Sequence, residues 1–256
     1  MIKQIQFKNN KKQTLRGYIH IPKKYNTAIV YLHGFPGSCR GTSPPRVGRD
    51  FMKLGYLVLR FDFSGTDTSD GKFEDKLISQ EVKDIKYAID FLYKNYKFKN
   101  LILAGGSTGA IDAALYASKD KRINKLVLIS GVSYLDQAAN YDFSDRQVKD
   151  FWEKGYIIYK SNKGKNHWLH NKKLKKQFYD EFFKLDIPSS IKKFKKPILI
   201  IHGDKDPHIP VIKDPLELKS FSKKAKLKII KGAGHQFKKP KNWKQVVSSI
   251  KKFIKK

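Results

Sequence analysis

A short apolar segment that leads directly into a glycine-flanked serine constrains the fold of this chain more than any other feature. Residues 101–104, Leu-Ile-Leu-Ala, have the character of a buried strand, and residues 105–109, Gly-Gly-Ser-Thr-Gly, follow at once. A G-x-S-x-G sequence between a strand and a helix forms a sharp turn that exposes the serine hydroxyl at the edge of a sheet. We therefore expect Ser107 to stand at the end of a buried strand, with its hydroxyl accessible.

Strand-like and helix-like segments alternate along most of the 256 residues. The apolar segments that indicate strands are Thr14–Ile21, Thr27–Leu32, Tyr56–Phe61, Leu101–Ala104, Lys125–Ser130, Pro197–His202 and Lys226–Ile230. Apolar residues at three- and four-residue spacing indicate helices, most clearly over Ser79–Tyr93. The other expected helices are Pro45–Leu54, Ala110–Ser118, Asp214–Ser222 and Trp243–Ile254. This alternation predicts an α/β protein of one domain, with a mostly parallel central sheet flanked by helices on both sides.

Residues 133–190 interrupt the alternation. This segment carries aromatic, charged and helix-like stretches but no convincing core strand. Because long structureless connections are rare in compact domains and long insertions often form lids, we interpret residues 133–190 as a cap over the site rather than a remote helical insertion. Residues 1–132 and 191–256 would then form the core. Five aromatic residues of the cap are candidates for lining a pocket or for packing the cap onto the sheet, and we single out the first, second and last of them: Trp152, Tyr156, Tyr159, His167 and Trp168.

A serine hydroxyl is a weak nucleophile, so it needs a base within hydrogen-bond reach and a third group that holds the base in the correct tautomer. His235 is the candidate base, because it follows a glycine-rich turn after the last predicted strand and could reach over the carboxyl edge of the sheet. Two aspartates follow the Pro197–His202 strand. We favour Asp206 as the acid since it lies deeper in the loop, before Pro207, whereas Asp204 next to the strand is typical of a turn former.

A tetrahedral intermediate needs two hydrogen-bond donors directed at its oxygen. The backbone N–H of Thr108, directly after the serine, is one candidate, and the N–H of Phe35, in the turn after the Thr27–Leu32 strand, is the other. Other chemistry has less support. The glycines form neither G-x-G-x-x-G nor a phosphate-binding P-loop, and the single Cys39 beside scattered histidines offers no zinc-ligand spacing. We expect no cofactor and no metal.

The formal net charge of +31 is extreme and would attract nucleic acids or anionic membrane surfaces. All but seven of the 54 basic residues are lysines, spread along the whole chain. Specific nucleic-acid recognition favours arginine and charge gathered on one face, so we interpret the excess as compositional bias and expect no specific nucleic-acid partner. No apolar run approaches the roughly 18 residues of a membrane-spanning helix, and the N-terminus lacks a signal-peptide block, which predicts a soluble, cytoplasmic protein. Nothing in the sequence indicates an oligomeric state.

Four motifs, taken in order, resemble those of the serine α/β-hydrolase superfamily: His33-Gly34-Phe35, residues 105–109, residues 202–210 and Gly234-His235. Residues 60–74 are similar to the small bacterial cinnamoyl and feruloyl esterases. The resemblance implies an α/β-hydrolase fold with a cap insertion. It also implies a small-molecule substrate, a carboxylic ester of a small to medium acyl or aryl-acyl group, which the enzyme cleaves through an acyl-enzyme. The residues that it implies are a triad of Ser107, Asp206 and His235, with oxyanion donors at Phe35 and Thr108.

Two other functions stay open at this stage. A serine peptidase of the aminopeptidase or oligopeptidase type uses the same three residues in the same order, but it would need carboxylates in or near the cap to hold the free amine of its substrate. Asp180-Glu181 and Asp142–Asp145 are available for this purpose. A non-catalytic basic binding protein on the same fold is the other alternative, although a pure binder would have no need of a complete triad.

Overall fold

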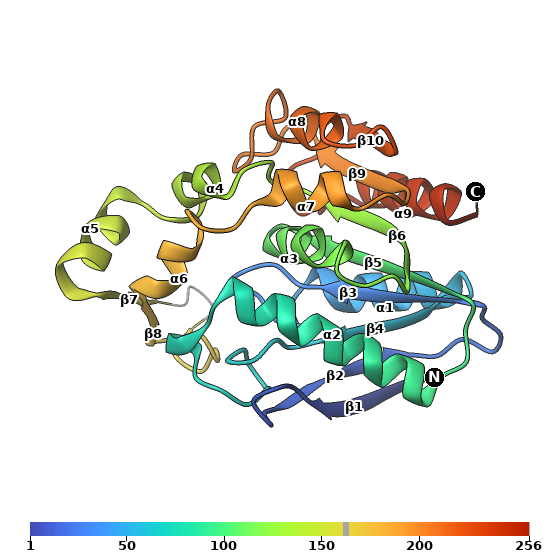
Figure 1. Cartoon of the computed structure of the whole chain (residues 1–256), viewed down its shortest axis with the longest axis horizontal. Helices are drawn as coiled ribbons and strands as arrows, with labels where there is room; N and C mark the ends of the chain where they lie inside the picture. The colour runs from blue at the N-terminus through green and yellow to red at the C-terminus, as the bar shows by residue number, and fades with distance from the viewer. Residues whose placement is uncertain (161–163, 256) are drawn as a thin grey trace.

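A computed structural model describes residues 1–160 and 164–255 of the protein, and its centre is an eight-stranded sheet (Figure 1). The strand order is β1-β2-β4-β3-β5-β6-β9-β10. β2 runs antiparallel to both of its neighbours, and the other adjacent pairs are parallel. The strands are β1 (Ile2–Lys8), β2 (Thr14–His20), β3 (Thr27–Leu32), β4 (Leu57–Phe61), β5 (Asn100–Gly106), β6 (Ile123–Ile129), β9 (Ile198–Gly203) and β10 (Ala225–Ile230). This architecture confirms the predicted α/β class with a mostly parallel central sheet.

The central strands are apolar along their length because both faces of the sheet are covered. Every residue of β3, β4 and β9 is buried. The pattern changes at the two edges, where β10 exposes Lys226 and Lys228 and β1 exposes most of its side chains. Polar and charged edges of this kind discourage pairing with the sheet of another molecule. β1 is absent from the predicted strands, because polar residues outnumber apolar ones within it.

Helices cover the two faces of the sheet in separate layers. The helices of the core are α1 (Ser43–Lys53), α2 (Ile78–Asn95), α3 (Thr108–Ala117), α8 (Asp214–Ser220) and α9 (Pro240–Lys255). On one face, α1 and α9 share an apolar cluster with Ile29 and Tyr31 of β3. On the other face, α2 and α3 share a cluster with Val30 and Leu32. Neighbouring residues of β3 thus point to opposite faces, so each face of the sheet has its own apolar core.

The segment predicted to be a cap projects from one end of the sheet, at the left of Figure 1. Its elements are α4 (Leu135–Asp142), α5 (Asp145–Lys154), β7 (Tyr156–Tyr159), β8 (Lys172–Lys175), α6 (Lys176–Glu181) and α7 (Ile187–Lys193). β7 and β8 form a separate two-stranded sheet, and no described part of this segment joins the central sheet. The predicted limit at residue 190 falls inside α7, which packs against α3 of the core. The projecting part therefore ends before α7.

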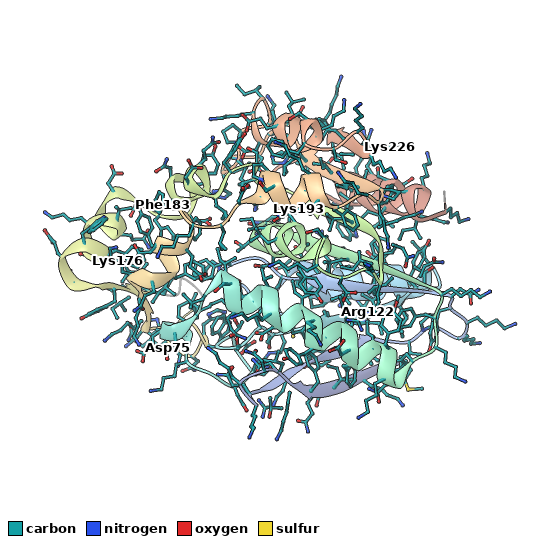
Figure 2. All side chains as sticks on the ribbon, viewed as in Figure 1. Asp75, Arg122, Lys176, Phe183, Lys193 and Lys226 are labelled. Atoms are coloured by element: carbon teal, nitrogen blue, oxygen red, sulfur yellow. The ribbon has the colours of Figure 1, made fainter. Side chains whose placement is uncertain are left out.

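Lysine side chains are spread over the surface rather than gathered on one element. Lys176 on α6, Lys193 on α7 and Lys226 on β10 lie on well-separated parts of the molecule in Figure 2. This placement agrees with the dispersed lysines of the sequence. Within residues 1–160 and 164–255, no helix is long and apolar enough to cross a membrane.

Candidate active site

Ser107 lies at the junction of β5 and α3 and has a positive φ of 55° with a ψ of −127°. A positive φ is strained for a residue with a side chain and marks a sharp turn here. The Ser107 N–H donates to the carbonyl oxygen of Ile129 at 2.9 Å, which fixes the turn against β6. A side chain at Gly105 would overlap with the carbonyl of Gly109, which explains why glycines flank the serine.

The loop after β3 lies directly against this serine. A β-carbon added to Gly34 would stand 2.9 Å from Cβ of Ser107. The buried ring of His33 shapes the loop, because its Nδ1 lies 3.1 Å from the carbonyl oxygen of Gly34 and must donate to it. Burial lowers the pKa of His33 to about 4, so the ring is neutral. The backbone N–H groups of Phe35 and Thr108 donate no hydrogen bond within the described chain and are available to a ligand.

His235 lies in the loop that follows β10, and its Nδ1 is 2.8 Å from Oδ2 of Asp206. A carboxylate oxygen only accepts, so Nδ1 carries a proton and Nε2 is left as the acceptor nitrogen of the neutral ring. Two contacts hold the loop in place. The Ser130 hydroxyl donates to the carbonyl of His235 at 3.0 Å, and the Arg46 guanidinium donates to the carbonyl of Gln236 at 2.9 Å. A neutral imidazole with a free Nε2 is the form that can take a proton from a serine hydroxyl.

Asp206, and not Asp204, contacts this imidazole. The Asp206 side chain has no exposed surface, and its Oδ1 accepts from the backbone N–H groups of His208 and Ile209 at 2.9 and 3.1 Å. Burial acts to raise the pKa of the Asp206 carboxyl, but its hydrogen bond to the imidazole and the backbone donors outweigh burial and lower the pKa. Asp204 accepts from the backbone N–H of Gly232 at 2.6 Å and so joins the loops after β9 and β10.

Ser107 and His235 line one cavity of about 670 Å³. Phe35 and Thr108 lie in its wall, while Asp206 reaches it through its contact with His235. A cavity of this size falls in the range of small-molecule sites. The residues of segment 133–190, the predicted cap, that lie in the wall include Tyr141, Asp142, Tyr159, His167 and Leu169. Among the described residues, no cluster of histidine, cysteine and carboxylate side chains could hold a metal ion.

Of the five aromatic residues named from the sequence, Tyr159 and His167 line the cavity, and the other three lie elsewhere. Trp152 is 69% exposed, and the Lys176 ammonium stands 3.8 Å from the centre of its ring. Tyr156 likewise lies against a lysine ammonium, and Trp168 packs edge to face on Phe73. Within the described residues the cavity wall includes none of the three, which revises the expectation that they line the pocket. Trp152 lies on the outer surface of the segment, and Tyr156 and Trp168 pack against other side chains instead.

Two residues of segment 133–190 that line the cavity carry ionisable groups: the carboxylate of Asp142 and the phenol of Tyr159. Tyr159 lies on β7, where successive side chains alternate between two faces, so it shares a face with Ile157 and not with Tyr156. Asp142 is exposed to solvent, but the protein around its carboxyl partly desolvates it and raises its pKa to about 6, and the nearby His235 limits the rise. Burial also raises the pKa of Tyr159, so its hydroxyl keeps its proton. The sequence named Tyr159 as one of five aromatic candidates, but alternation over a four-residue strand is too short a pattern to distinguish it from Tyr156.

Residues 23–239 match the family described as serine aminopeptidase, S33. The chain belongs to this family. Together with the solved structures, the match confirms the resemblance to the serine α/β-hydrolase superfamily and the α/β-hydrolase fold. Est1E from Butyrivibrio proteoclasticus with bound ferulic acid aligns with a TM-score of 0.81 over 98% of this chain and 97% of its own, at 23% identity. Alpha/beta hydrolase domain-containing protein 10 from mouse aligns with a TM-score of 0.77 over 99% and 98%, at 19% identity.

The curated relatives are mitochondrial palmitoyl-protein thioesterases named ABHD10. The protein from Bos taurus is 28% identical over 111 residues, which is 43% of this chain and 34% of the relative. The protein from Rattus norvegicus is 22% identical over 204 residues, 73% of this chain and 61% of the relative. The matched region thus spans about a third of the length of the first of these relatives. The comparisons establish a serine α/β hydrolase with esterase and thioesterase neighbours.

Proposed function

We propose that the protein hydrolyses carboxylic esters with small to medium acyl or aryl-acyl groups through an acyl-enzyme. The observation that carries this proposal is the hydrogen bond between His235 and Asp206 beside the cavity that also contains Ser107. These residues follow β5, β9 and β10, whose carboxyl ends bring them together from distant parts of the sequence. A nucleophile, a base and an orienting acid are the components that acyl transfer requires.

In the proposed reaction, Oγ of Ser107 attacks the carbonyl carbon of the ester while Nε2 of His235 takes the hydroxyl proton. The carbonyl oxygen becomes an oxyanion that accepts hydrogen bonds from the N–H groups of Phe35 and Thr108. The bond to the alcohol oxygen then breaks, and His235 returns the proton to that oxygen. Water attacks the acyl-enzyme with the same base and releases the carboxylic acid. Asp206 stays ionised throughout and stabilises the imidazolium.

The cap side of the cavity supports a substrate with a mixed character. From this side Leu169 contributes apolar surface, which Ile111 of α3 extends on the core side, and Asp142 and Tyr159 contribute polar groups. A wall of this kind suits an acyl group that is largely apolar and carries a hydrogen-bond donor. Est1E, whose solved structure contains ferulic acid, supports an aryl-acyl group. The relatives named palmitoyl-protein thioesterases make a thioester the natural second substrate to test.

A serine aminopeptidase is the second candidate, and Asp142 is the observation that favours it. Its carboxylate lies in the cavity wall, where it could hold a substrate amine. Two other carboxylates suggested by the sequence as amine-binding groups have other partners. Asp180 pairs with Lys176 at 2.5 Å, and Glu181 accepts from the Ser79 backbone N–H at 3.0 Å. One carboxylate can bind an amine less strongly than a pair, so the ester remains the better-supported substrate.

A fluorophosphonate probe and a substrate panel test the proposal. The panel contains aryl and alkyl oxyesters, acyl thioesters and aminoacyl amides. We expect Ser107 to be labelled, the esters to have the highest kcat/KM, and Ser107→Ala to lose both labelling and several orders of magnitude in kcat. Ser249→Ala on α9, outside the cavity wall, is the matched control and should behave like the natural protein.

Other results point to other functions. Faster cleavage of aminoacyl amides than of esters would replace the esterase with the aminopeptidase. Absence of labelling, combined with salt-dependent binding of nucleic acid, would indicate a basic binding protein. Unchanged turnover in Ser107→Ala would contradict the role of this serine.

A further inference from the structure

His202 is a second imidazole that contacts the carboxylate of Asp206. It is the next-to-last residue of β9 and has no exposed side-chain surface, and its Nε2 lies 3.3 Å from Oδ2 of Asp206. The same nitrogen lies 3.1 Å from the carbonyl oxygen of Ile209. The loop after β9 therefore folds back over the ring. As a result, one imidazole contacts both the acid and the backbone three residues beyond it.

These two contacts define the protonation of His202. A carbonyl oxygen can only accept, so Nε2 carries a proton and donates it to Ile209, while Oδ2 of Asp206 lies 3.3 Å from the same nitrogen. Nδ1 is buried and has no partner among the described residues. A proton on Nδ1 would be buried without an acceptor, which is unfavourable, and burial lowers the pKa of His202. The ring is therefore neutral, and its only N–H donates to the Ile209 carbonyl beside the acid.

All the hydrogen bonds to Asp206 come from uncharged groups when His235 is neutral. Oδ2 accepts from the N–H of His235 and lies 3.3 Å from Nε2 of His202, and Oδ1 accepts from the backbone at His208 and Ile209. Within the described chain no lysine or arginine pairs with this carboxylate, although the sequence holds 54 basic residues. A buried cation would neutralise the carboxylate. Neutral donors hold it in place and leave its charge to act on the imidazolium that forms during the reaction.

We infer that His202 is a positioning residue for the reaction: its Nε2–H fixes the orientation of the Asp206 carboxylate and partly disperses the charge on Oδ2. This inference rests on the proposed function, because it concerns the acid of the proposed triad. Without the donor, Oδ2 has only the N–H of His235, and its full charge acts on that ring. The imidazolium then holds its proton more tightly, so the acidic limb of the pH profile of kcat/KM moves to higher pH.

Two replacements of His202 separate positioning from packing. His202→Leu keeps an apolar side chain of moderate size but removes the donor. His202→Gln keeps an N–H at about the position of Nε2. A hydrogen bond to a charged group is strong enough that we expect His202→Leu to lower kcat/KM by ~10–100-fold, mainly through kcat, and to shift the acidic limb upward. His202→Gln should restore most of the rate and the natural acidic limb.

The control is His20→Leu. His20 is also a buried histidine on a central-sheet strand with an unpartnered Nδ1 among the described residues, but its Nε2 accepts from Arg60 at 2.9 Å and is outside the cavity wall. Its loss should reduce thermal stability and leave the acidic limb in place. A leucine variant of His202 with an unshifted limb, or equal losses in its leucine and glutamine variants, would overturn the inference.

The tautomer of His202 gives a readout that does not depend on activity. Nitrogen-15 spectra of histidine-labelled protein should show a neutral ring protonated at Nε2 near neutral pH. A ring protonated at Nδ1, or at both nitrogens, would overturn the inference even if the leucine variant failed to fold. Failure of the proposed function looks different: the natural protein would neither label nor hydrolyse any ester, whatever the tautomer.

Discussion

Replacing Asp206 with asparagine tests the chemistry of the site with the smallest change of shape. Three N–H groups donate to the carboxylate, two of them to Oδ1 and one to Oδ2, and a fourth, on His202, lies beside Oδ2 with its nitrogen 3.3 Å away. Asparagine offers one oxygen and one NH₂ group, so it can accept hydrogen bonds on one side only. The backbone N–H groups of His208 and Ile209 cannot move their protons, whereas an imidazole can change tautomer. The asparagine oxygen should therefore stay with the backbone and turn its NH₂ group toward His235.

An NH₂ group opposite Nδ1 forces the proton of His235 onto Nε2. In that tautomer Nε2 cannot accept the proton of Ser107, and the imidazolium also loses its stabilising charge. We expect kcat to fall by ~10⁴, which corresponds to about 5 kcal/mol of activation free energy. The fold should persist, because two of the four N–H groups at Asp206 keep their acceptor.

Asp204→Asn is the matched control, with the same chemical change two residues away. Asp204 accepts only the Gly232 N–H among the hydrogen bonds described above, and an asparagine oxygen can still do so. Both variants are compared by ester turnover at saturating substrate, with folding matched by circular dichroism and thermal unfolding. A loss below about tenfold for Asp206→Asn, or a larger loss for Asp204→Asn, would refute the tautomer argument.

The cavity wall and a buried ion pair yield three further predictions. Asp142→Asn should change the ranking of kcat/KM across the acyl groups of the panel, whereas Trp152→Ala, at a side chain that is 69% exposed, should leave the ranking unchanged. Partial desolvation raises the pKa of Asp142 from 3.8 to about 6, so the folded state keeps a proton that the unfolded state releases. The free energy of unfolding should therefore fall as pH rises through this interval, by a small amount because the residue is exposed and screened by solvent, and urea titrations of Asp142→Asn should lack that fall. Lys76 and Glu81 form a buried ion pair, so Glu81→Gln should lower the free energy of unfolding by ~3–5 kcal/mol, and the double variant Lys76→Met with Glu81→Leu should recover much of it; a single variant as stable as the natural protein would contradict this reasoning.

Secondary structure was predictable where one local pattern dominated. The predicted strand Thr27–Leu32 coincides with β3, because a strand buried on both faces is apolar throughout. The predicted helix Ser79–Tyr93 lies within α2, because its apolar residues repeat at the helical period along one buried face. β1 and the β7–β8 pair carry no such pattern. These strands are stabilised by pairing with a neighbouring strand, and the sequence of one segment does not show which segment it will pair with.

The sequence by itself determined the α/β class, the sharp turn at Ser107 and the order in which serine, aspartate and histidine follow successive strands, because strand and turn signals are local. It also reduced the acid to two residues. Only the tertiary structure decided that Asp206 meets His235, that His202 contacts the same carboxylate, and that Asp142 rather than Trp152 lines the cavity. These contacts depend on how closely the loops after β9 and β10 and residues 133–190 approach one another. The sequence pattern of a single segment carries no information about distances between segments.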